Sequence, residues 1–154
     1  MEQWELEASE AIRRTITAYN FATDRGAFED VAECFTENGV LELASGERVT
    51  GRAAIVSLLE GVGPNADRSD NADGAATPSY VHHHVTNVHF RSLMPSAADV
   101  SCYFLVLTAV GTDHWGRYRD RLVRSGDGRW LFEHRLAIAD GYAPHSRFLR
   151  ERGA

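Results

Sequence analysis

The sequence contains little that would tie the protein to a membrane or to nucleic acid. No apolar run approaches the roughly 20 residues that a membrane-spanning helix requires, and the acidic start MEQWELEASEAIRR lacks the apolar core of a secretion signal. The net charge is −6, and no block of basic residues marks a nucleic-acid-binding surface. We therefore expect a cytoplasmic protein with no nucleic-acid partner and no membrane partner.

Cysteine is equally scarce. Cys34 and Cys102 are far apart in the chain, and neither belongs to a CxxC pair or to a set with zinc-ligand spacing. Each has apolar neighbours, which favours buried free thiols over a disulfide. Cysteine therefore predicts neither a metal site nor a covalent cross-link.

The order of the patterns predicts one α+β domain over residues 1–154. Apolar residues recur at helical spacing over about residues 4–24, 28–35 and 51–62, and a hairpin is expected around residues 44–46. Four strand-like segments rich in β-branched and aromatic residues follow: YVHHHVTNVHF, DVSCYFLVLTAV, GRYRDRLVRS and RWLFEHRLAIAD. We expect a curved, mainly antiparallel sheet packed on the N-terminal helices and enclosing a cone-shaped space.

Two segments resemble neither helix nor strand. Residues 61–79 are rich in Gly, Asp, Asn and Pro, which predicts a mobile loop that is either a lid over a pocket or a tolerated insertion. Residues 141–154 form a basic tail that we expect to be partly frayed.

Three consecutive histidines, His82 to His84, are the most conspicuous feature of the first long strand. Strand side chains alternate between faces, and Val88 and Phe90 suggest that the even-numbered face is the interior one. This places His84 inside the cone.

On the same reasoning Thr86 lies beside the interior histidine and His82 lies near the mouth of the cone. His83 then belongs to the other face, or takes the interior position if the register is shifted by one residue. Val85 lies on the odd-numbered face, so the pattern is not a clean alternation.

Other polar residues interrupt apolar faces that are expected to point inward. Tyr19 lies in the apolar stripe of the first helix, and His134 interrupts the apolar face of the last strand. Tyr118 and Asp120 share one face of the preceding strand. Asp24 lies in the last turn of the first helix, where a carboxylate opposes the helix dipole, so another role is indicated.

The chain resembles SnoaL-like proteins of the nuclear transport factor 2-like superfamily. The resemblance covers about residues 5–140 and rests on the stretches TAYNFATDRGAFEDVAECFTENGVLEL, GRAAI, HHVTNV and GRYRDRLVRSGDGRWLFEHR. It implies the cone-shaped fold of that superfamily. Because this fold hosts dehydratases, isomerases, cyclases, hydrolases and non-catalytic subunits, the fold alone does not imply one activity.

Within that superfamily the pattern is most similar to that of scytalone dehydratase and bile-acid dehydratase relatives. The resemblance implies that Tyr19, Asp24 and His84 are catalytic, with His83 as the alternative to His84. Val110 stands where scytalone dehydratase carries a second catalytic histidine, and Leu43 stands where ketosteroid isomerase relatives carry their base.

These observations favour a cofactor-independent lyase, a dehydratase that uses a His–Asp pair on a hydrophobic cyclic or polyketide-like carbonyl compound. The alternatives are an isomerase or cyclase in the same pocket and a non-catalytic ligand-binding domain. The remaining residues expected to contact the substrate are His82, Thr86, Tyr118, Asp120, His134 and Phe28.

Metal binding by the histidine run and a purely structural polar role are the competing interpretations of these residues. His82 and His84 lack a third ligand with suitable spacing, so we expect no metal. Val85, Val123 and Ala137 are expected on an exposed sheet face, which predicts a homodimer or higher homo-oligomer.

Overall fold

A computed structural model describes residues 1–62 and 80–149. Its elements follow the order α1 (Gln3–Asp24), α2 (Phe28–Glu33), β1 (Phe35–Glu42), β2 (Arg48–Thr50), α3 (Arg52–Val62), β3 (Val81–Leu93), β4 (Ala97–Thr108), β5 (Gly111–Arg124) and β6 (Trp130–Tyr142). Helices precede a long run of antiparallel strands, so the predicted α+β class is confirmed. None of the helices among these residues is both long and apolar enough to cross a membrane.

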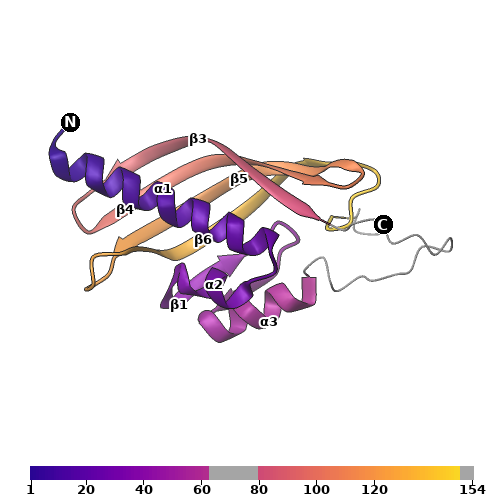
Figure 1. The fold of residues 1–154 in the computed structure, drawn as a ribbon, viewed down its shortest axis with the longest axis horizontal. Coiled ribbons are helices and arrows are strands. Elements are labelled where there is room, and N and C mark those ends of the chain that lie inside the picture. Colours follow the sequence, from indigo (N-terminus) through magenta and orange to yellow (C-terminus); the bar gives the residue numbers. More distant parts are fainter. Residues whose placement is uncertain (63–79, 150–154) are drawn as a thin grey trace.

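One six-stranded sheet carries the fold, with the strand order β2-β1-β6-β5-β4-β3. All neighbouring pairs are antiparallel except β1 and β6, which run parallel. The sheet curves, and α1 runs across one face of it while α2 and α3 cover the end formed by β1 and β2 (Figure 1). Side chains of α1 pack against this face of the sheet.

Helix α1 ends in a backbone arrangement that fixes where Asp24 lies. Gly26 has a φ of 68°, the left-handed conformation that glycine adopts without strain. The Gly26 and Ala27 N–H groups donate to the Thr23 and Ala22 carbonyls, which is the Schellman pattern of helix termination. This ending leaves Asp24 as the last helical residue.

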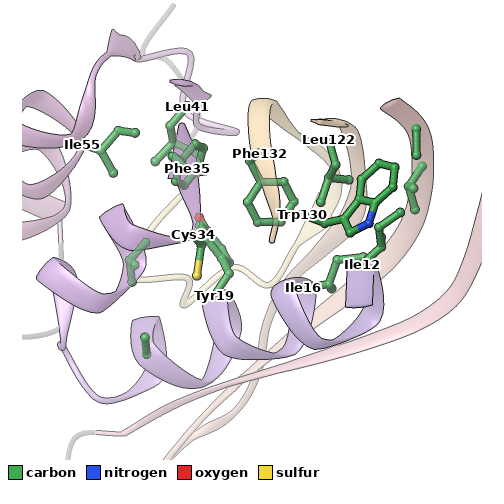
Figure 2. Close-up of a cluster of buried hydrophobic side chains, with 14 of the residues drawn as sticks. Ile12, Ile16, Tyr19, Cys34, Phe35, Leu41, Ile55, Leu122, Trp130 and Phe132 are labelled. Carbon is green, nitrogen blue, oxygen red and sulfur yellow. The ribbon is translucent and has the colours of Figure 1, made fainter. Parts of the chain in front are cut away.

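Buried apolar side chains from the helices and from the concave face of the sheet form the main core. They come from all three helices and from β1, β4, β5 and β6, and include Ile12, Ile16, Phe35, Leu41, Ile55, Leu122 and Phe132 (Figure 2). A second, smaller cluster lies between β3, β4 and β5 and contains Val81, Cys102, Phe104, Val106 and Tyr118. Both cysteines are buried free thiols, as expected.

The segment TENG, residues 36–39, belongs to strand β1 although glycine and asparagine are common in turns. Gly39 explains how β1 passes this point, because a Cβ there would lie 2.8 Å from the Phe35 Cβ and 2.9 Å from the Phe132 carbonyl oxygen. The close approach lets β1 pair with β6, which the glycine-and-asparagine pattern did not indicate.

A bulge in β3 changes which residues face the interior. Thr86 pairs with Tyr103 and His89 with Ser101, so two residues of β3, Asn87 and Val88, face one residue of β4. Asn87 has a φ of 54°, a conformation that asparagine tolerates better than most residues. Before the bulge the odd-numbered residues face inward, and after it the even-numbered ones do.

A second bulge does the same in β6. Leu122 pairs with Phe132 but Arg121 pairs with His134, which leaves Glu133 as the extra residue. Interior positions therefore pass from Phe132 to Arg135 and Ala137 instead of to His134.

Because of these two bulges, the prediction that Val85 and Ala137 lie on an exposed sheet face is wrong. Val85 packs against both core clusters, and Ala137 packs against the smaller one. Of the three residues, only Val123 lies on the outer face, because its neighbour in β5, Leu122, is the buried one.

Candidate functional site

A cavity of about 260 Å³ opens between the C-terminal half of α1, the concave sheet face and residues 147–149. Its walls are mainly apolar, with a small number of polar groups, as is usual for small-molecule sites. Its lining includes Tyr19, Phe28, His83, His114, Tyr118 and Phe148.

His83 is joined to Asp24 at one wall of this cavity. The distance from His83 Nδ1 to Asp24 Oδ1 is 2.6 Å, and the His83 backbone N–H also donates to the carboxylate, at 3.0 and 3.1 Å. The side chains are 13% and 15% exposed. A carboxylate only accepts, so the ring donates through Nδ1 and leaves Nε2 as an unprotonated base in the neutral imidazole.

The expectation that His84 points into the cone is wrong. His84 is exposed on the opposite face of β3, beside Leu105 of β4, and the interior position belongs to His83. The reason is the bulge at Asn87: alternation read backwards from Val88 and Phe90 crosses it and acquires an error of one residue. Val85, on the odd-numbered face, was the sign of this change.

His82 and Thr86 share that outer position and do not line the cavity. The His82 ring lies against Tyr80, with ring centroids 4.7 Å apart. The three consecutive histidines therefore divide into one interior residue and two surface residues.

Tyr19, Tyr118 and Phe28 line the cavity. Burial raises the pKa of both tyrosines, although the positive charge of Arg135 opposes the shift. The phenols are thus neutral hydrogen-bond donors near neutral pH.

The structure places Asp120 and His134 away from the cavity lining. Asp120 is buried and accepts two hydrogen bonds from Arg135, at 2.9 and 3.0 Å. Burial raises the Asp120 pKa although the guanidinium opposes it. His134 lies outward, with its Nε2 2.8 Å from Glu42 Oε1, because the bulge at Glu133 gives its interior position to Arg135.

A second His–Asp pair lines the cavity, and the sequence pattern did not reveal it. His114 Nδ1 lies 2.7 Å from Oδ2 of its own neighbour, Asp113. Adjacent strand residues normally point to opposite faces, but Val106 pairs with His114 and Leu107 with Thr112, so Asp113 is an inserted bulge residue. The bulge lets the two adjacent side chains meet, and the dipeptide Asp113-His114 by itself gives no indication of a bulge.

The surroundings of this pair set its charge. Asp113 is fully buried and accepts from the Ser146 hydroxyl at 2.7 Å and the Arg147 N–H at 2.8 Å. Burial opposes its ionisation, but these donors and His114 outweigh it and lower the Asp113 pKa. Burial lowers the His114 pKa, the Asp113 carboxylate opposes this, and the charge of His83 adds to the lowering.

The first part of the tail packs against β5. Residues 143–149 pack over the start of β5, where Ser146 is buried and Phe148 lies 5.6 Å from the His114 ring. Phe148 and Leu149 close one side of the cavity. Residues 150–154 and most of the expected lid-like loop, residues 63–79, lie outside the described residues.

The described residues at this site do not form a set of metal ligands. In the two described stretches, no three His, Cys, Asp or Glu side chains converge as the ligands of a metal ion would. The polar groups at the cavity include two imidazoles, each with its own carboxylate, and two phenols, which are suited to proton transfer to and from a carbonyl compound. Thr23, Ser45, Glu47 and Arg147 are the other polar lining residues.

Solved structures with the same fold come from several bacteria. A provisionally named scytalone dehydratase from Novosphingobium aromaticivorans has a TM-score of 0.75 and 22% identity, over 97% of this chain and 94% of its own. A protein from Catenulispora acidiphila in complex with S-DNPA has a TM-score of 0.72 and 28% identity, over 88% and 95% of the two chains. ActVI-ORFA from Streptomyces coelicolor has a TM-score of 0.69 and 19% identity, over 90% and 99%.

No curated protein matches the sequence. The family model of the SnoaL-like domain, in contrast, matches residues 4–136, which include α1, the whole concave sheet face up to Leu136 and both His–Asp pairs. The curved six-stranded sheet with its covering helices is the nuclear transport factor 2-like fold of the solved neighbours. The chain belongs to the SnoaL-like family.

Proposed function

We propose that the protein is a cofactor-independent dehydratase that acts on a hydrophobic cyclic carbonyl compound. The observation that carries the proposal is the 2.6 Å bond between His83 Nδ1 and Asp24 Oδ1, with the ring lining the cavity. The sequence indicated His84 for this role, with His83 as the alternative if the register was shifted, and we assign the role to His83. Asp24 and Tyr19 keep their expected roles.

The first step is removal of a proton next to the substrate carbonyl. Asp24 holds the His83 ring with Nδ1–H toward itself, so Nε2 is the basic atom and the imidazolium that forms is stabilised by the carboxylate. The two C–H bonding electrons move into the substrate, and its carbonyl oxygen gains negative charge. Tyr19 donates a hydrogen bond to that oxygen, which stabilises the enolate.

The second step breaks the bond between the β-carbon and its hydroxyl group. The enolate electrons form the new C=C bond, and the departing hydroxide takes one proton and leaves as water. Either the His83 imidazolium returns its proton or a second acid supplies it. His114 lines the same cavity with its own carboxylate partner, so it is the second proton-transfer group in this mechanism.

An apolar cavity wall supports a hydrophobic substrate. Phe28, Leu59, Val106 and Phe148 are among its lining residues, and apolar residues outnumber polar ones in the lining. The volume of about 260 Å³ lies just below the range of about 300–1,000 Å³ typical of small-molecule sites, which favours a compact ring system. The likeness of the fold to a provisionally named scytalone dehydratase agrees with this chemistry.

An isomerase or a cyclase is the second candidate, since the same base and the same enolate serve both. In an isomerase the enolate is reprotonated at another carbon, by the proton that His83 removed. Only dehydration lowers the product mass by one water, so product mass separates these activities.

The test is turnover of cyclic β-hydroxyketones, followed by loss of one water in mass spectrometry. His83→Gln should reduce the rate by about 10²–10⁴-fold, the range for loss of a general acid–base group. His84→Gln is the matched control, because it changes the adjacent histidine on the outer face. Equal losses in both variants, or none in His83→Gln, would refute the assignment.

We further propose that the protein is a homodimer that pairs through the outer sheet face. Tyr103, Leu105 and Trp115 are 55%, 36% and 41% exposed on neighbouring strands, and Leu105 is the direct cross-strand partner of Trp115. Contiguous exposed apolar surface of this kind is a feature of protein–protein contacts. These residues replace Val85 and Ala137 in the expected interface.

A further inference from the structure

Arg135 is a fully buried cation directly behind the cavity wall. Its guanidinium carbon lies 4.2 Å from the ring centroid of Tyr19 and 3.9 Å from that of Tyr118, and Phe132 packs against it at 4.4 Å. Figure 2 shows Tyr19 projecting from α1 toward Phe35 and Phe132. Both tyrosines line the cavity, so one cation touches the faces of two cavity phenols.

Asp120 orients this guanidinium from the side away from the rings. The two parallel hydrogen bonds, Nε to Oδ1 at 2.9 Å and Nη2 to Oδ2 at 3.0 Å, fix its plane. Nη1 is buried and has no hydrogen-bond partner among the described residues. The guanidinium is therefore held by a carboxylate on one edge and by aromatic faces, and its charge is only partly compensated.

Stability alone is a poor reason for this arrangement. Removing a guanidinium and a carboxylate from water costs several kcal/mol per ion, and apolar side chains of similar volume are often as stable or more stable in such places. A cation on the face of a phenol ring draws electron density from the ring. The hydroxyl of that ring becomes more acidic and donates a stronger hydrogen bond.

We propose that Arg135 is a positioning residue that fixes the rings of Tyr19 and Tyr118 at the cavity wall and strengthens their hydroxyls as donors to a ligand oxygen. The inference rests on the proposed function, in which Tyr19 stabilises an enolate. To that function it adds a second phenol, Tyr118, and the charge of Arg135, which acts on both phenols. Asp120 contributes indirectly, because it fixes the orientation of the Arg135 guanidinium.

The acidity of Tyr19 reports this effect without any substrate. The charged and titratable groups that act on Tyr19 are Arg135 from β6, Asp120 from β5 and Cys34 next to β1, and burial opposes its ionisation. Of these, Arg135 alone carries a positive charge. Removing the charge while keeping the packing should make Tyr19 less acidic, and a merely structural role would leave the acidity unchanged.

The experiment is a ¹⁹F NMR titration of the protein with 3-fluorotyrosine at its five tyrosines, with signals assigned by Tyr19→Phe and Tyr118→Phe. In the double variant Arg135→Met/Asp120→Leu, which removes both charges, the acid dissociation constant of Tyr19 should fall severalfold, because Arg135 lowers the Tyr19 pKa more than Asp120 raises it. Arg135→Lys keeps the charge, so the acid dissociation constant of Tyr19 should stay close to the wild-type value in that variant. The exposed residues Tyr80 and Tyr103 serve as internal controls.

An unchanged Tyr19 titration in a folded double variant would overturn the proposal. If that variant does not fold, ¹⁵N-arginine labelling of the wild-type chain decides: the Arg135 Nε signal should move as Tyr19 ionises, and not in Tyr19→Phe. A static signal overturns the proposal. Neither readout requires dehydration, so a failed search for a substrate would not be confused with a failed inference.

Discussion

Asp24 accepts hydrogen bonds from both the backbone N–H and the ring Nδ1 of His83. One carboxylate at the end of α1 thus fixes a residue of the edge strand β3 and also orients its imidazole. The strand register and the proton-transfer geometry depend on the same side chain. A change at Asp24 should therefore be visible both in stability and in turnover.

Replacing Asp24 by Asn should reduce turnover by about 10²–10⁴-fold, because an amide no longer stabilises the imidazolium or enforces the Nδ1–H tautomer. It should also lower the free energy of unfolding by about 1–3 kcal/mol, since one amide oxygen replaces a carboxylate that serves two donors. Chemical denaturation and single-turnover rates measure the two effects. Unchanged turnover in a folded variant would remove Asp24 from the mechanism.

The pair His114–Asp113 should make the protein less stable in acid. The folded-state pKa of His114 lies below its ordinary value, so the unfolded chain binds the proton more readily and stability falls as the pH drops through about 6.5. Urea denaturation between pH 8 and 5 should show this loss, and it should be smaller in His114→Gln. An equal slope in both proteins would contradict the assignment.

Asp113 acts in a lower pH range. Its folded-state pKa lies below its ordinary value, so its contribution to stability is complete above about pH 4 and is lost as the pH falls through the folded-state pKa. Asp113→Asn should be less stable than the wild type at pH 7, and the difference should shrink toward pH 2. Because Asp113 also holds Ser146 and Arg147, residues 143–149 should become more susceptible to protease in this variant.

Arg135→Met alone should be strongly destabilising, by about 3–5 kcal/mol, because it leaves the buried Asp120 carboxylate without its partner. The double variant Arg135→Met/Asp120→Leu should recover most of the loss. Guanidinium denaturation of the two proteins makes the comparison. If the double variant is as unstable as the single one, packing and not charge is what Arg135 contributes.

The oligomeric state tests the outer face. Light scattering should give twice the chain mass for the wild type and the single-chain mass for Trp115→Glu, which places a charge among exposed apolar residues. Glu133→Lys changes an exposed residue of β6 and is a control that should not alter the mass. A wild-type monomer would refute the proposed dimer.

The order of helices and strands followed from periodicity because helical and strand patterns persist over many residues. Interior positions on the strands did not, because bulges interrupt the alternation. Three of these bulges, at Asn87, Asp113 and Glu133, decide how the residues discussed as site residues are oriented. A bulge depends on pairing with the neighbouring strand, and a strand pattern taken alone carries no record of it.

The same bulges decide which site residues the sequence could predict. Tyr19 and Phe28 lie on helices, whose faces follow directly from spacing, and both line the cavity. His84 and His134 lie beyond a bulge from the residues used to orient them, and both face outward. His114 meets Asp113 only because the inserted residue turns two neighbours to one side.

The role of His83 as the base depends on its tautomer, which long-range ¹H–¹⁵N NMR of the histidine side chains measures. Neutral His83 should carry its proton on Nδ1, toward Asp24, and this preference should be lost in Asp24→Asn. His84, exposed on the other face, should be unaffected by that substitution. A proton on Nε2 of His83 in the wild type, or an identical spectrum in Asp24→Asn, would contradict the account.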